Sequence, residues 1–201
     1  MEKLWSARLP AKHRRWSLAA LNISLILLVF WSVGTWQARN LLPEDKSLPA
    51  PDFELKTLDG KPFQLHRQEG GAYILYLFTP WCTICGLSAG NRNSLPGVSD
   101  GLNSLVYAVA LDWSSIDEVI RFAGKHDLKV PVLLGSPRVA DDYRIRSFPT
   151  YYVLVAEKRV FHRTVGYLTA LGMRWNLARA RHPDFGLHFF NFCFNNSVLI
   201  S

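Results

Sequence analysis

Short uninterrupted apolar runs recur along the middle of this chain. Such runs are too short for a helix, and they predict strands that are buried on both faces of a sheet. Three segments share the pattern: 72–78, 105–111 and 130–134. Earlier, 51–55 and 63–65 alternate apolar and polar positions around Asp59-Gly60, which predicts a β-hairpin.

Apolar residues at helical spacing separate these strands and follow them. The helices predicted in this way cover 83–95, 116–123, 139–143 and 170–180, the second of them capped by Ser114 or Ser115. Between the last two, 151–155 and 159–165 predict an antiparallel pair. Strands that alternate with helices and finish in a hairpin plus helix predict an α/β domain with a mixed sheet.

The N-terminal part of the chain has a different pattern. Residues 16–38 contain no charged side chain over 23 positions, and about 20 apolar residues suffice to cross a bilayer. Residues 1–15 are basic, which favours a cytoplasmic N-terminus and an exported remainder. We therefore predict a transmembrane anchor. A cleaved signal peptide is the competing interpretation, although Val33-Gly34-Thr35-Trp36 is a poor cleavage site.

These patterns divide the 201 residues into five parts. The predicted boundaries are a basic segment at 1–15, an anchor at 16–38, a linker at 39–50, one domain at 51–181 and a tail of unassigned structure at 182–201. The net charge is +7, of which the first fifteen residues supply +4. The charge that remains is too small and too dispersed to indicate a nucleic-acid partner.

The candidate chemistry lies where the first buried strand meets the following helix. The segment reads Trp81-Cys82-Thr83-Ile84-Cys85. A cysteine at a helix N-terminus reacts as a thiolate, because unpaired backbone N–H groups and the helix dipole stabilise negative charge there. We therefore predict that Cys82 is the nucleophile and that Cys85, one turn later and less exposed, is the resolving thiol.

Metal binding is the plain alternative for a C-x-x-C pair. Zinc would need two more ligands, and neither Cys193 nor the scattered histidines have the required spacing. Haem attachment would need a histidine after Cys85, where the chain has Gly86. We expect no metal and no cofactor.

A second motif, Ser147-Phe148-Pro149-Thr150, comes just before a later predicted strand, with Pro149 placed 67 positions after Cys82. Prolines often begin strands for steric reasons alone. Together with the cysteines, however, Pro149 suggests a cis-proline beside the reactive thiol. Such a bond would leave the Thr150 N–H and nearby carbonyls free to pair with a substrate peptide.

These motifs resemble the membrane-anchored TlpA/ResA/DsbE-like branch of the thioredoxin superfamily, over about 50–181. Residues 166–174 resemble the ScsD-like group of suppressor-of-copper-sensitivity proteins. The resemblance implies a thioredoxin-like fold with an N-terminal hairpin extension and an inserted βα unit. It also implies a periplasmic protein disulfide oxidoreductase at the bacterial inner membrane. Members usually reduce cysteine-containing periplasmic proteins, in cytochrome c maturation or metal-stress defence, with electrons from a DsbD-like membrane donor.

The chain departs from that family at two carboxylates. Many relatives carry glutamate where this chain has Ser88, and thioredoxin buries an aspartate where this chain has Tyr76. Water or another base must then take the proton from Cys85, and Asp112 is the nearest candidate by topology. A helix N-cap is an equally plain role for Asp112. Thr83 and Ile84 tune the potential of the pair in a direction that the sequence leaves open.

Two other functions compete with disulfide exchange. The thiols could hold Cu(I), a soft ion that suits thiolates, although the chain has only Met1 and Met173 and no Met/His cluster. A thiol peroxidase is suggested by Thr79 three positions before Cys82, the T-x-x-C pattern of peroxiredoxins. That wider motif also expects a proline where this chain has Leu75.

Overall fold

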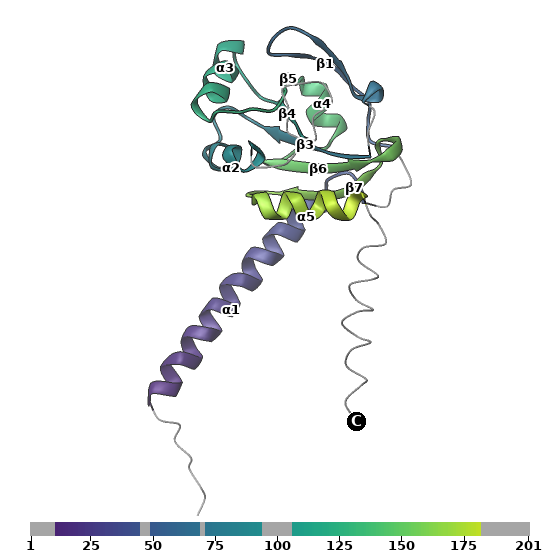
Figure 1. Cartoon of the computed structure of the whole chain (residues 1–201). Helices are drawn as coiled ribbons and strands as arrows, with labels where there is room; N and C mark the ends of the chain where they lie inside the picture. Colours follow the sequence, from purple (N-terminus) through teal and green to yellow (C-terminus); the bar gives the residue numbers. More distant parts are fainter. Residues whose placement is uncertain (1–10, 45–48, 69–70, 94–105, 182–201) are drawn as a thin grey trace, which may run out of the picture. The chain divides into compact units, whose positions relative to one another are not determined.

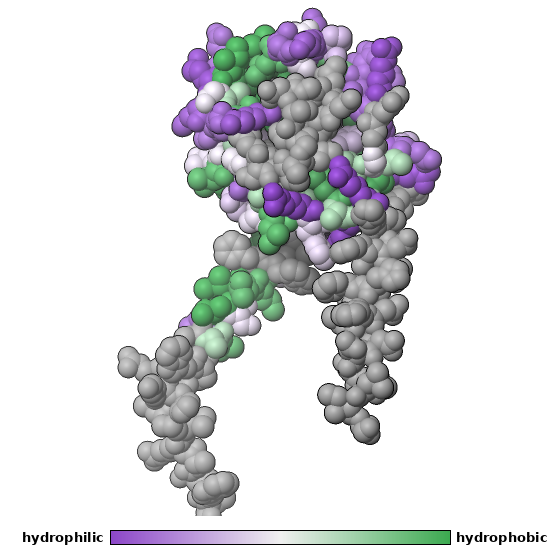
Figure 2. Space-filling view, in the orientation of Figure 1, coloured by the Kyte–Doolittle hydropathy of each residue, from purple (hydrophilic) through white to green (hydrophobic). Residues whose placement is uncertain are grey.

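The computed structural model describes residues 11–44, 49–68, 71–93 and 106–181 and divides the chain into two compact units, 1–39 and 40–201. In the first unit, one helix, α1, runs over Ala11–Ala38. Many of its apolar side chains are exposed between Leu21 and Val29, and they are green in Figure 2. Within the described residues, no helix combines the length and the apolar character that crossing a membrane requires. The structure therefore does not support the transmembrane anchor predicted over 16–38.

The second unit is built on one seven-stranded mixed sheet (Figure 1). The strands are β1 (Glu54–Thr57), β2 (Pro62–Gln64), β3 (Ala72–Phe78), β4 (Val106–Ala110), β5 (Val132–Leu134), β6 (Thr150–Val155) and β7 (Val160–Val165). Their order is β2-β1-β5-β4-β3-β6-β7. Neighbours β3/β4 and β4/β5 are parallel, and the other neighbours are antiparallel. The three central strands are the three apolar runs of the sequence.

Helices cover both faces of this sheet. They are α2 (Thr83–Asn93), α3 (Ile116–Lys125), α4 (Pro137–Asp142) and α5 (Ala170–Arg181), with short 3-10 turns η1 (Leu65–Arg67) and η2 (Ala156–Lys158). All seven residues of β3 are buried, and they alternate between two cores. One core holds Leu75 and Leu77 with α4 and the β1–β2 hairpin. The other holds Tyr76 and Phe78 with α2, α3 and α5.

Part of the predicted linker packs on the domain. Leu41 is buried, and the Arg163 guanidinium of β7 donates 2.6 Å hydrogen bonds to the backbone carbonyls of Leu41 and Leu42. Glu44 accepts from the Arg163 backbone N–H at 2.9 Å. Further on, the Ala50 N–H donates to the Lys158 carbonyl at 2.9 Å. The compact unit therefore begins at residue 40 rather than 51, because these polar contacts and one buried leucine hold the segment against β7.

Most predicted elements match the structure to within a few residues. Ser115 caps α3, since its side chain accepts a hydrogen bond from the Glu118 N–H. Helix α2 ends at Asn93, and the end predicted for it at residue 95 lies outside the described residues, as does the tail over 182–201.

Candidate active site

The strand β3 and the helix α2 together fix the position of Cys82. After β3 ends at Phe78, a tight turn forms in which the Cys82 N–H donates to the Thr79 carbonyl at 3.2 Å. The Cys82 carbonyl then accepts from the Gly86 N–H at 3.2 Å, the first bond of the helical pattern. Cys82 is therefore the N-terminal capping residue of α2, and its side chain is half-buried.

The Cys82 sulfur lies against the open end of the helix. The Cys85 backbone N–H donates to Cys82 Sγ at 3.2 Å, so the sulfur satisfies one of the N–H groups that a helix leaves unpaired at its start. Donors that point at a sulfur bind it more strongly when it carries a negative charge. The arrangement therefore suits a sulfur that reacts as a thiolate.

Cys85 has the opposite environment. Its side chain is fully buried, and this burial, together with the hydrogen bond to Cys82, raises the pKa of the Cys85 thiol to about 12. A backbone hydrogen bond with Thr79 and, to a smaller extent, the Tyr76 hydroxyl lower that pKa, but burial outweighs both. Both cysteines are free thiols, so the structure is that of the reduced pair. The accessible sulfur is Cys82, and Cys85 stays protonated behind it.

Tyr76 is the polar group that reaches the resolving cysteine from the core. Its ring is fully buried and stacks on Phe78 and Tyr151, with centroid distances of 5.2 and 5.1 Å. Its hydroxyl donates to the Cys85 backbone carbonyl at 3.1 Å. Sequence reasoning noted only that Tyr76 replaces an aspartate. The signal that could have revealed its role was a tyrosine inside an otherwise apolar buried strand, because a buried hydroxyl needs a partner.

The predicted proline loop lies next to Cys82. The Phe148–Pro149 peptide bond is cis, and the Cys82 thiol points at the Phe148 carbonyl at 3.8 Å. The backbone beyond it is less free than expected. The Pro149 carbonyl accepts from the Gly166 N–H at 2.8 Å, and Thr150 is buried at the start of β6, where its hydroxyl donates to the Ser147 carbonyl.

Trp81 and Asp112 form the rim of the site in a way that the sequence did not predict. The Trp81 indole is 61% exposed, packs edge-on against Phe148 and donates to the Asp112 carbonyl at 3.1 Å. Asp112 thus acts through its backbone, which adopts a positive φ of 48°. Its other predicted role as a helix cap belongs to Ser115. Tyr76 is the residue whose hydroxyl reaches Cys85, and the role of the Asp112 carboxylate as the base for Cys85 stays a prediction.

The remaining predicted residues are on the first turn of α2. Thr83 and Ile84 are exposed, and Ile84 faces solvent with 48% of its surface. Ser88 is buried one turn after Cys85. No group of three or more potential metal ligands occurs within the described ranges.

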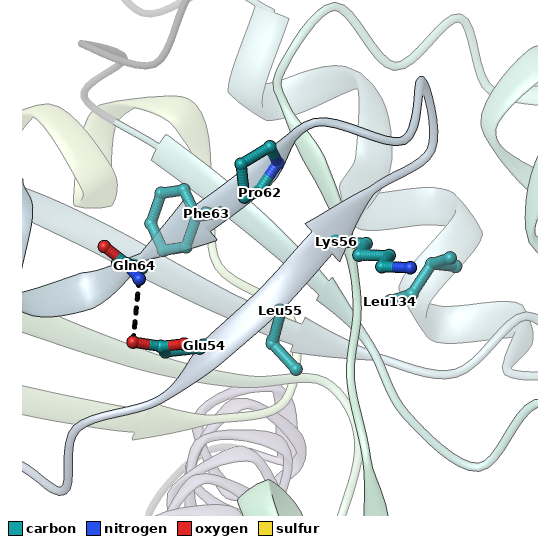
Figure 3. Close-up of a pocket in the computed structure, with 7 residues that line it drawn as sticks. All are labelled: Glu54, Leu55, Lys56, Pro62, Phe63, Gln64 and Leu134. Carbon is teal, nitrogen blue, oxygen red and sulfur yellow. Dashed lines mark hydrogen bonds between the residues drawn. The ribbon is translucent and has the colours of Figure 1, made fainter.

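A hollow lies away from the cysteines, between the β1–β2 hairpin and β5. It has a volume of about 430 Å³ and is lined by Glu54, Leu55, Lys56, Pro62, Phe63, Gln64 and Leu134 (Figure 3). Neither cysteine lines it, and the hydrogen bond between Gln64 and Glu54 crosses one end of it. The reactive chemistry is therefore at the Cys82 end of β3, and not in this hollow.

Comparison with known proteins decides the family. The sequence model of the AhpC/TSA family matches residues 47–163, more than half of the chain. The chain belongs to the AhpC/TSA family. Among curated relatives, the thioredoxin-like protein YneN of Bacillus subtilis (strain 168) is 26% identical over 171 residues, which cover 82% of this chain and 97% of YneN. The thiol-disulfide oxidoreductase ResA of Bacillus cereus is 25% identical and covers 74% of this chain and 88% of that protein.

Solved structures give the fold. A putative thiol:disulfide interchange protein DsbE from Chlorobium tepidum superposes with a TM-score of 0.59 at 22% identity, over 69% of this chain and 99% of that one. The thioredoxin-like α/β fold with its mixed sheet is thereby confirmed. With its pair of free thiols and its likeness to curated thiol–disulfide oxidoreductases, this member of the AhpC/TSA family is a thiol–disulfide oxidoreductase.

Proposed function

We propose that the protein reduces disulfides of exported proteins, with Cys82 attacking and Cys85 resolving. The observation that carries this proposal is the contrast between the two sulfurs. Cys82 is partly exposed at the start of α2 and accepts a backbone hydrogen bond, whereas Cys85 is fully buried and its thiol has a raised pKa. Only one sulfur can meet a substrate, and the other is held one turn away for the second step.

The reaction has two steps. The Cys82 thiolate attacks one sulfur of a substrate disulfide, and the other substrate sulfur leaves and takes a proton. Cys85 then loses its proton and attacks Cys82 Sγ, which forms the Cys82–Cys85 disulfide and releases the second substrate thiol. Two electrons pass from the pair to the substrate, so an external dithiol must reduce the pair again. We propose a DsbD-like membrane donor for that step.

Substitution of each cysteine tests the order of events. Cys82→Ser should abolish exchange, whereas Cys85→Ser should accumulate mixed disulfides with substrates because the second step is missing. Cys193→Ser, outside the described residues, is the matched control and should retain activity. Full exchange activity in both the Cys82→Ser and Cys85→Ser variants would refute the mechanism.

The direction of electron flow needs its own experiment. Acid quenching of intact cells, followed by alkylation with a mass tag, gives the redox state of the pair. We expect a mostly reduced pair that becomes oxidised when the donor is deleted. A mostly oxidised pair in normal cells would instead identify an oxidant that introduces disulfides.

We further propose a periplasmic domain attached to the bacterial inner membrane by the N-terminal segment. The uncharged run over 16–38 behind a basic segment of the sequence supports it. A membrane-impermeant thiol reagent should label Cys82 in intact spheroplasts. Labelling only after lysis would place the domain in the cytoplasm. The resemblance to the ScsD-like group adds metal-stress defence as the proposed pathway, with cytochrome c maturation as the alternative.

Two competing activities are tested with the same purified protein. Binding of Cu(I) by the reduced pair, lost on Cys82→Ser, would support a copper-handling module. Turnover of peroxide would support a thiol peroxidase, and we expect none.

A further inference from the structure

A groove between α2 and α3 opens beside Cys82, which is one of its lining residues. Its volume is about 270 Å³, and its lining includes Trp81, Cys82, Gly86, Leu87, Lys125 and His126. Two of these residues are basic and none is acidic. The Lys125 side chain is exposed, whereas His126 is half-buried. The groove therefore combines apolar walls with a basic end.

The imidazole at that end is held in a fixed place. His126 is the C-terminal capping residue of α3, and its ring packs on Phe122 with a centroid distance of 4.6 Å. The other side of the ring lies against α2 at Gly86, where an added Cβ would be only 2.6 Å from two ring atoms. A glycine inside a helix costs about 1 kcal/mol relative to alanine. Because Gly86 has no side chain, the His126 ring can lie close to α2, and the helix bears that cost.

The covalent intermediate brings substrate residues to this groove. Because Cys82 is itself a lining residue, a substrate joined to its sulfur has its neighbouring residues within reach of the walls. Two residues of extended chain span about 7 Å. The loop that carries Phe148 contacts the same sulfur but does not line the groove. The groove and the proline loop therefore lie at different places around Cys82.

We propose that this groove binds the residues next to the substrate cysteine and selects an acidic side chain within two positions of it. Lys125 supplies an exposed positive charge that attracts a carboxylate, and the His126 ring forms the wall beside it. The exposed apolar surfaces of Trp81 and Leu87 take a neighbouring apolar side chain. The groove thus provides substrate preference, and the proposal rests on the disulfide-exchange function proposed above.

The test uses full-length protein and two peptides that differ only in one residue, Glu or Lys, two positions from a single cysteine. Each peptide carries its cysteine as a mixed disulfide with 2-mercaptoethanol, which is neutral. We expect the Glu peptide to react about five- to tenfold faster than the Lys peptide at low salt, because each exposed charge pair contributes up to about 1 kcal/mol. The ratio should fall as salt is raised.

Variants then assign the preference to the groove. Lys125→Glu should abolish or reverse the ratio. Lys56→Glu, the same charge change on β1 at the other hollow, should keep the wild-type ratio. A wild-type ratio near one, or a ratio that Lys125→Glu leaves unchanged, would overturn the groove proposal. Bis(2-hydroxyethyl) disulfide separates the two proposals, because failure of the wild type to reduce it would contradict the exchange function itself.

Discussion

Removal of one buried hydroxyl should slow the second half of the reaction. The Tyr76 hydroxyl acts to lower the pKa of the Cys85 thiol, and Tyr76→Phe deletes it while keeping the stacked ring. The hydroxyl has one proton, which it donates to the Cys85 carbonyl in the neutral pair and can turn toward Cys85 Sγ when the thiolate forms. A hydrogen bond to a charged group is worth about 1 kcal/mol more than one to a neutral group. The ionised fraction of Cys85 should therefore fall about fivefold.

A higher reactivity of the Cys85 thiolate offsets part of the fall in its ionised fraction. A thiolate becomes more nucleophilic as its pKa rises, with a Brønsted coefficient of about 0.4–0.5. A pKa increase of about 0.7 therefore restores roughly twofold in reactivity. The net expectation is a resolution step that is about two- to threefold slower at neutral pH. The free energy of unfolding should fall by only about 1 kcal/mol, the value of one buried hydrogen bond.

The assay begins from a mixed disulfide between Cys82 and 2-mercaptoethanol in a Cys193→Ser background. Release of the small thiol is followed by stopped flow as Cys85 attacks. Tyr151→Phe is the matched control, since it removes another buried tyrosine hydroxyl from a ring that stacks on Tyr76. If Tyr76→Phe resolved as fast as that control across the pH range, the assigned role of the hydroxyl would be refuted.

Three further predictions concern stability. Gly90→Ala, where an added Cβ meets open space, should raise the free energy of unfolding by about 1 kcal/mol, whereas Gly86→Ala should lower it by roughly 1–3 kcal/mol, as judged by urea denaturation. Burial raises the pKa of the Cys85 thiol from 9.0 to about 12. The protonated thiol should therefore contribute its full stability to the reduced protein below pH 9 and lose that contribution as the pH rises to 12. The difference in urea midpoint between the wild type and Cys85→Ser should change over that window and not below it. Arg163→Ala should release residues 41–44, so limited proteolysis should cleave there sooner, and unchanged cleavage would contradict the role of the guanidinium.

Local patterns were sufficient to predict the centre of the fold. The run 72–78 specifies a strand buried on both faces, and the cysteine pair follows it at the start of a helix, because both features depend on near neighbours in sequence. The cap at Ser115 was predicted for the same reason. These features place Cys82 at the helix start before any tertiary contact is known.

Contacts between distant segments were not predictable in this way. Nothing in the sequence near Gly86 indicates that an imidazole forty residues later will pack on it. The linker over 39–50 reads as polar and proline-containing, yet one arginine of β7 fixes part of it. The sequence suggests a role for the Asp112 carboxylate, whereas the Asp112 backbone carbonyl makes the contact with Trp81. Each of these unpredicted contacts involves a backbone group or a partner that is remote in sequence.

The segment over 41–50 also bears on self-association. β7 is an edge strand of the sheet, and an exposed edge is a template for pairing with another chain. Here Glu44 accepts the N–H of Arg163, and Pro49 forms a bridge with Arg159. A soluble fragment that began at residue 51 would lose this cover and gain a tendency to aggregate through β7. A fragment that began at Asn40 would keep the edge protected.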